Sequence, residues 1–176
     1  MEVGMIDNMS RKVKINDLMQ RGYEYELVEE EGQGFDESFE PDLSPKQMLK
    51  LGVFGGVYMR DCKDEFGDWF DEAKLAEGKR DESLNFFEVE ASQSLSVWRE
   101  KGWINEEHDP RGWFQWYCRY YKGRRLPQED ERQIKRWRAF KRHWAQVEKN
   151  CLKGDWDCRR KQRQALLHWA SDSRKI

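Results

Sequence analysis

Residues 109–125, DPRGWFQWYCRYYKGRR, are central to the fold because they combine six aromatic and five cationic side chains in one short segment. Asp109 followed by Pro110 is typical of a helix start, since a short acidic side chain can accept from free backbone N–H groups and proline suits the first helical position. Gly123 is typical of a helix end. The segment therefore predicts a helix over about 110–122.

A helix turns about 100° per residue, which would separate the rings of this segment from its cations. All six rings fall within an arc of roughly 160°. The polar row on the opposite side is Arg111, Gln115, Arg119 and Lys122. Since an aromatic stripe at helical spacing usually packs inward, we expect the rings to be chiefly core. Candidates for exposed aromatic side chains are Trp116 and Tyr121 at the edges of the arc, and Tyr58 upstream.

A second amphipathic helix is expected over about 128–149. Its first turn holds Glu129, Asp130 and Glu131, where negative charge suits the helix dipole. One stripe is apolar and consists of Ile134, Trp137, Phe140, Trp144 and Val147. The opposite side is cationic and consists of Arg132, Lys135, Arg136, Arg138 and Arg142. Between Arg111 and Trp144 the chain has 11 bases and only 3 acids, so these cationic rows lack neighbouring acids to pair with.

Unpaired cationic rows repel one another unless an anion joins them, and arginine offers a planar fork suited to phosphate and to guanine edges. The sequence therefore favours a nucleic-acid-binding module, for DNA or RNA, with a basic ridge on two adjacent helices. The residues expected to form this ridge are Arg111, Gln115, Arg119, Lys122, Arg124, Arg125, Arg132, Gln133, Lys135 and Arg136. An ordinary solvated face is the alternative interpretation of such a charge run.

The net charge of −2 conceals a strong asymmetry: residues 1–90 hold 23 acids against 11 bases, whereas residues 91–176 hold 11 acids against 21 bases. Residues 1–40 are expected to be a flexible acidic arm, because a self-repelling segment buries little apolar surface. This arm could dock on the cationic half of the same chain. YEYELV, residues 23–28, could form one short strand within it.

Residues 41–176 are expected to form a single, compact, mainly α domain with an aromatic-rich core. Ser44 and Pro45 suit a helix start, with Gln47 placed to complete a capping box. Further helices are expected over 66–75 and 92–102, and a final one from about Asp157 to Ser171.

Residues 1–14 lack the apolar run of a secretory signal, and the longest apolar stretch, LGVFGGVYM at 51–59, is too short to cross a bilayer. We therefore expect an intracellular protein of the cytoplasm, with the nucleus also open and no membrane partner. In a reducing compartment its four cysteines would be free thiols. The wide spacing of Cys151 and Cys158 does not favour zinc, and His143 and His168 are expected to be surface residues.

Two other functions stay open. An enzyme acting on a nucleic-acid base or phosphate would need a carboxylate, and the candidates are Asp61, which follows a glycine turn, and Asp130. However, the chain carries no phosphate-binding loop, dinucleotide fingerprint or nucleophile elbow, so no cofactor is indicated. A protein-interaction or scaffold role is the remaining alternative.

Four segments carry a resemblance to a widespread family of short uncharacterised proteins from bacteria, large viruses and eukaryotes. They are LGVFGGVYMRD, DPRGWFQWYCRYYKGRR, DERQIKRW and RQALLHWASDSRKI. The resemblance covers roughly residues 39–176. It implies a single domain and indicates no chemistry, and it leaves the acidic arm outside.

Overall fold

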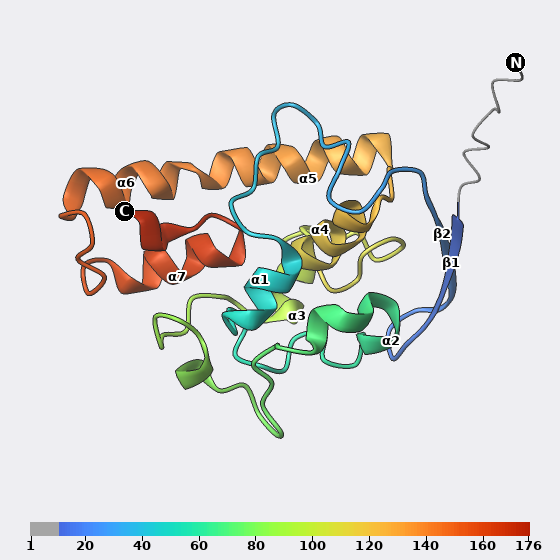
Figure 1. Ribbon diagram of the computed structural model, residues 1–176, viewed down its shortest axis with the longest axis horizontal. Helices are drawn as coiled ribbons and strands as arrows, with labels where there is room; N and C mark the ends of the chain where they lie inside the picture. Colours follow the sequence, from blue (N-terminus) through green and yellow to red (C-terminus); the bar gives the residue numbers. More distant parts are fainter. Residues whose placement is uncertain (1–10) are drawn as a thin grey trace, which may run out of the picture.

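A computed structural model describes residues 11–176, which form a mainly helical fold with one two-stranded sheet (Figure 1). The strands are β1 (Arg11–Asn16) and β2 (Arg21–Leu27), and the helices are α1 (Pro45–Lys50), α2 (Lys63–Phe66), α3 (Leu95–Glu100), α4 (Trp113–Lys122), α5 (Pro127–Phe140), α6 (Arg142–Asn150) and α7 (Arg160–His168). Short 3-10 helices cover Gly67–Phe70, Glu82–Leu84 and Ser173–Lys175. The expected mainly α architecture is therefore confirmed.

Helix α4 is enclosed on all sides, since every residue from Arg111 to Tyr120 is buried. It packs against α1 and α5. The helix begins later than expected, at Trp113. Its N-cap residue is Gly112, and no side chain bonds to the free backbone N–H groups of the first turn. Asp109 is therefore not the N-cap residue. Its carboxylate instead forms ion pairs with Arg119 and Arg124. The φ angle of +101° at Gly112 explains why glycine stands there.

The core is built mainly from rings, and Phe39 lies at its centre with 1% of its surface exposed. The ring of Phe39 meets those of Trp137, Trp116 and Tyr117 edge to face, at centroid distances of 4.9, 5.5 and 5.6 Å. Such edge-to-face pairs are favoured by the ring quadrupole. The expectation of an aromatic-rich core is confirmed.

The expectation of a flexible arm over residues 1–40 is wrong for residues 11–40. Strands β1 and β2 pair as an antiparallel hairpin, in which Val13 faces Tyr25 and Lys14 faces Glu24. YEYELV does overlap β2, as expected. Alternation along the strands places Ile15 and Tyr25 on the buried side, so this acidic segment has an apolar face after all. Residues 1–10 lie outside the described residues.

After β2 the chain continues along the C-terminal end of α4. The amides of Val28 and Glu29 donate to the carbonyl of Gly123, and the amide of Gly32 donates to Tyr121 O. A side chain at residue 123 would overlap the backbone of Glu29, and its φ of +124° also favours glycine. Gly123 therefore ends α4 and also allows the N-terminal segment to approach it closely.

The local helix signals are largely correct. Ser44 and Gln47 form the expected capping box, with Pro45 in the first turn of α1. The helix expected over 128–149 exists as α5 and α6, which run nearly in line (Figure 1) and are separated at Lys141 by i to i+3 hydrogen bonds. The helix expected over 66–75 is only partly correct: α2 ends at Phe66, a 3-10 helix covers Gly67–Phe70, and residues 71–75 are not helical.

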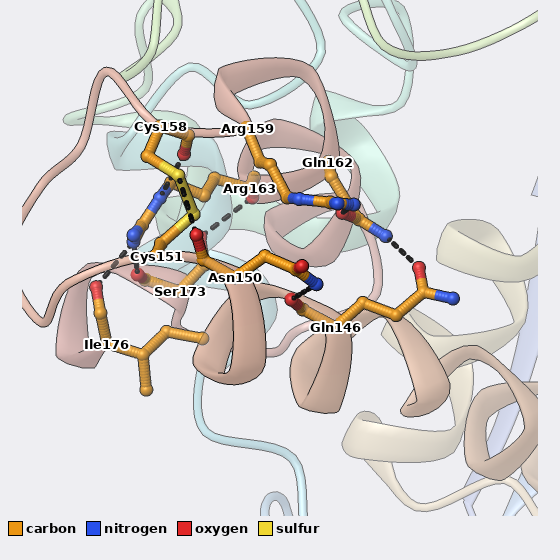
Figure 2. Close-up of a disulfide and its surroundings, with 9 residues drawn as sticks. All are labelled: Gln146, Asn150, Cys151, Cys158, Arg159, Gln162, Arg163, Ser173 and Ile176. Carbon is orange, nitrogen blue, oxygen red and sulfur yellow. Dashed lines mark hydrogen bonds between the residues drawn. A yellow bond between two sulfur atoms is a disulfide. The ribbon is translucent and has the colours of Figure 1, made fainter.

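Helices α6 and α7 form an antiparallel pair whose connecting loop is closed by a disulfide between Cys151 and Cys158 (Figure 2). The expectation of four free thiols is therefore wrong for Cys151 and Cys158. The spacing of these two cysteines, which does not favour zinc, allows a disulfide that closes the loop. Cys62 and Cys118 are free and buried. Next to the disulfide, the buried Arg163 donates to the carbonyls of Cys158 and Ser173.

Candidate functional site: an aromatic pocket beside Arg136

The basic ridge expected on α4 is wrong as a surface, because its arginines are buried in ion pairs. Arg119 is 0% exposed; its Nε lies 2.7 Å from Glu65 Oε1 and its Nη1 lies 3.2 Å from Asp109 Oδ1. Arg124 Nη2 lies 2.6 Å from Asp109 Oδ2. Arg111 donates from both Nη atoms to Asp61, at 2.8 and 2.6 Å. These cations are neutralised by the protein's own carboxylates.

Three further residues of the expected ridge, on α4 and just after it, also contact other parts of the protein. Gln115 is fully buried and its Oε1 accepts from the amide of Arg111. Lys122 donates to the carbonyl of Glu65, and burial lowers its pKa. Arg125 stacks on the ring of Tyr120 at 3.8 Å and donates to backbone carbonyls. A helical wheel places Gln115 and Lys122 on one face of α4, but that face is covered by other parts of the protein.

The cover is the N-terminal hairpin. The guanidinium of Arg119 lies 5.0 Å from the ring of Tyr23 and 5.4 Å from that of Tyr25. Tyr25 also donates its hydroxyl to Glu65 at 2.9 Å, and burial together with this carboxylate raises the pKa of the phenol. The acidic segment thus docks on the cationic half of the chain, but mainly through rings and backbone. Within residues 11–40, only Asp17 contributes a carboxylate to an ion pair, with Arg111 at 3.7 Å.

Both candidate catalytic carboxylates are bound to other groups of the protein. Asp61 holds Arg111 in two hydrogen bonds. Asp130 accepts from the indole N–H of Trp116 and from the backbone N–H of Leu126, both at 2.8 Å. Burial raises the pKa of Asp130 although these hydrogen bonds oppose the shift. Both residues have structural roles, and neither lines the large pocket of the molecule.

That pocket has a volume of about 760 Å³, within the usual range of ligand sites. It lies where α3 and the loop after it, α4, α5 and α7 come together. Its walls are chiefly aromatic and are formed by Phe54, Tyr58, Trp98, Trp103, Trp113, Phe114, Phe140 and Trp169. The charged residues around it are three cations, Arg136, Arg142 and Lys161, and one carboxylate, Glu90. Glu90 already forms an ion pair with Arg80.

Arg136 is the member of the expected ridge that reaches this pocket. Its guanidinium lies between two indoles, 5.8 Å from Trp103 and 5.3 Å from Trp169. It donates to Trp103 O and Gln133 Oε1, and no carboxylate within residues 11–176 pairs with it. Glu129, a nearby acid, is bound by Arg132, Asn105 and Gln133 instead. Burial, helped by the charge of Arg132, lowers the pKa of Arg136 to about 10.

His168 also lines the pocket, so the expectation of a surface histidine is wrong. Its Nε2 is buried without a hydrogen-bond partner, and its ring packs against that of Phe54 at 4.9 Å. Burial lowers its pKa to about 4, against the opposing effect of a hydrogen bond with the Val53 backbone, and the charge of Arg80 adds to the lowering. The imidazole is therefore neutral near pH 7.

The three aromatic side chains expected to be exposed have different outcomes. Trp116 is completely buried, because its ring packs against Phe39 and its indole N–H donates to Asp130 of α5. Tyr121 is half-buried against Trp69 and Phe35. Tyr58 is half-buried, donates its hydroxyl to Arg111 O and lines the pocket. Trp98 and Trp103 line the pocket and were not identified from the sequence. Only the folded structure, in which rings from distant segments surround one cavity, identifies them.

Several cations of α5 and α6 do stay exposed. Lys135, Arg138 and Arg142 face solvent, whereas Gln133 is buried. Arg132 is partly exposed but paired with Glu129 at 2.6 Å. Of the ten residues expected to form the ridge, four cations thus form no ion pair with a carboxylate of residues 11–176: Lys122 and Arg125, which donate to backbone carbonyls, and Lys135 and Arg136 on α5.

The described residues contain no group of three or more His, Cys, Asp or Glu side chains arranged to hold a metal ion. Within residues 11–176, no helix has both the length and the apolar character needed to cross a bilayer. Comparison of the chain with protein-family models, with curated proteins and with solved structures gives no match.

Proposed function

We propose that the protein is a nucleic-acid-binding module whose contact surface is the aromatic pocket and its cationic rim. This surface differs from the basic ridge that we expected on α4, because the arginines of that ridge form buried ion pairs within the protein. The ligand is an anion that carries flat rings, and nucleic acid combines both properties in every unit of its chain.

The observation that carries the proposal is Arg136. Arg136 is half-buried, and a cation that is partly removed from water loses hydration free energy unless an anion accompanies it. Arg111, Arg119 and Arg124 each have such a partner within the protein, whereas Arg136 faces a cavity and has none among residues 11–176. A phosphate oxygen at the pocket would supply the missing charge and accept a strong, charge-assisted hydrogen bond.

Two further features support this ligand class. Arg142 and Lys161 are exposed at the edge of the pocket, so they can contact further phosphates along a chain. The rings of the walls offer stacking surfaces, and arginine and tryptophan together are common in sites that bind single strands.

The test is a titration of the protein with fluorescein-labelled DNA and RNA oligonucleotides at two salt concentrations, followed by anisotropy. We expect affinity to fall with salt, by about 0.7 log units per log unit of salt for each phosphate contacted on a single strand. Arg136→Gln should weaken binding about tenfold or more, because it removes one charge-assisted contact.

Arg138→Gln is the matched control, since Arg138 is exposed on the same helix but does not line the pocket. It should change affinity much less than Arg136→Gln. Absence of binding to every oligonucleotide at low salt would refute the proposed function. Equal effects of the two variants would refute the assignment of the site.

A further inference from the structure

We infer that the pocket holds one unstacked base of a single-stranded nucleic acid, with the adjacent phosphate at Arg136. This inference rests on the proposed function and deepens it, because it names the form of nucleic acid that binds and the part of it that enters the cavity.

The first step is the state of the rings in the walls. Most rings of the core have their faces covered, but Tyr58 and Trp98 are only half-buried and Trp103 is 37% exposed. They come from segments far apart in the sequence and surround one cavity. A base stacking on such rings gains about 1–3 kcal/mol whatever its identity, because every base has a π face.

The second step is the position of the charge. The Arg136 guanidinium lines the cavity and lies 5.8 Å from the ring of Trp103, so a base held in the cavity has its own phosphate within reach of this cation. Arg142 and Lys161 lie at the edge of the same cavity. The neighbouring phosphates of the strand can therefore run over the rim while the base occupies the interior.

The third step is the polar lining. His168 Nε2 has no hydrogen-bond partner, and Ser92 and Gln93 are further polar groups of the wall. Hydrogen-bonding groups on the edge of a base are satisfied by base pairing in a duplex, whereas an unpaired base must find partners elsewhere. The side chains of Ser92 and Gln93, which are accessible to solvent in the wall, can bond to that edge.

The fourth step is the choice between single and double strands. In a duplex the bases are stacked and paired, and extruding one costs a few kcal/mol. A single strand offers its bases without that cost. The exposed cations of α5 attract either form, since they contact only phosphates, so the preference must arise in the pocket.

The experiment compares four ligands by anisotropy: single-stranded DNA and RNA of about 15 nucleotides, the matching DNA duplex, and an abasic strand of equal length, with a free mononucleotide as competitor. We expect the two single strands to bind about tenfold or more tightly than the duplex and the abasic strand. The mononucleotide should compete only weakly, because it lacks the phosphates that contact the rim.

Trp103→Ala should weaken single-strand binding about 5- to 100-fold and leave duplex binding nearly unchanged. Trp156→Ala is the matched control: Trp156 has a similar exposure, 42% against 37%, but lies outside the pocket. It should bind like the wild type. Far-ultraviolet circular dichroism of each variant verifies the fold, and Trp103→Phe, which keeps a ring, should restore most of the affinity.

The outcomes separate the two proposals. If no strand binds, the proposed function fails and this inference fails with it. If duplex and abasic strand bind as tightly as the single strands, and Trp103→Ala has no effect, the protein binds nucleic acid but the base-insertion site is overturned. If the mononucleotide competes as well as a strand, the pocket is a site for free nucleotides and the inference is overturned as well.

Discussion

The carboxylate of Asp109 and the guanidinium of Arg124 lie 2.6 Å apart, with 0% and 1% of their side chains exposed. The other oxygen of Asp109 is held by Arg119, whose charge is shared with Glu65. This buried network joins the loop before α4, the helix itself and the segment after it. Removing one partner of such a network leaves a desolvated charge without compensation, which is far more costly than losing a surface pair.

Asp109→Asn should therefore destabilise the protein by about 3–5 kcal/mol. Urea unfolding followed by tryptophan emission measures the loss as a lower midpoint. Asp68→Asn is the control, because its ion pair with Lys46 is largely exposed and should contribute less than about 1 kcal/mol. A loss at Asp109 no larger than that at Asp68 would contradict the role given to the network.

Phe39→Ala should cost about 3–5 kcal/mol, since it removes a buried ring from the centre of the aromatic core. The same urea titration measures this change. Glu40→Ala, at the exposed neighbouring position, should shift stability by less than about 0.5 kcal/mol. If both substitutions were nearly neutral, residues 11–40 would not be part of the cooperative fold.

Replacing Cys151 and Cys158 together by serine should lower stability by about 2–3 kcal/mol, because the disulfide closes a short loop of the unfolded chain. Addition of dithiothreitol should lower the urea midpoint of the wild type by a similar amount. It should leave the double variant unchanged, since Cys62 and Cys118 are already free. A wild type insensitive to the reductant would argue against the disulfide.

His168 should make the protein less stable as the pH falls from about 6.5 to about 4. In this window the unfolded chain binds a proton at His168 and the folded chain does not, so stability decreases as the pH is lowered. The shift corresponds to a loss of about 3 kcal/mol across the window. Midpoints of urea unfolding for wild type and His168→Phe, measured at several pH values, should diverge accordingly; parallel curves would show that burial does not hold this imidazole neutral.

The helices and the inward direction of the rings could be predicted because their causes are local. The capping box of Ser44 and Gln47 spans four residues, and the aromatic arc of α4 follows from the turn of one helix. Gly123 was also recognised as a helix end. Its second task, allowing the backbone of Glu29 to approach, depends on a segment more than ninety residues away and leaves no local pattern.

The burial and ion pairing of the arginines could not be predicted, because the carboxylates that pair with them are distant in sequence. Glu65 precedes Arg119 by 54 residues and Asp61 precedes Arg111 by 50. A helical wheel assumes that the polar side of a helix faces water, and this assumption fails for a helix surrounded by protein. The pocket was missed for a related reason: Trp98, Phe140 and Trp169 belong to separate segments, and each alone looks like an ordinary core residue.

Helix α4 touches the N-terminal hairpin through Arg119 and Tyr25, and the C-terminal region through Trp113 and Trp169, whose rings are 4.8 Å apart. Removing either the N-terminal hairpin or the C-terminal region would therefore expose buried side chains of α4 to solvent. Shortened versions that lack residues 11–40, or the stretch after α6, should aggregate instead of forming a smaller stable unit. Anyone dividing the protein into pieces for biochemical work should keep residues 11–176 together and place fusion tags outside them.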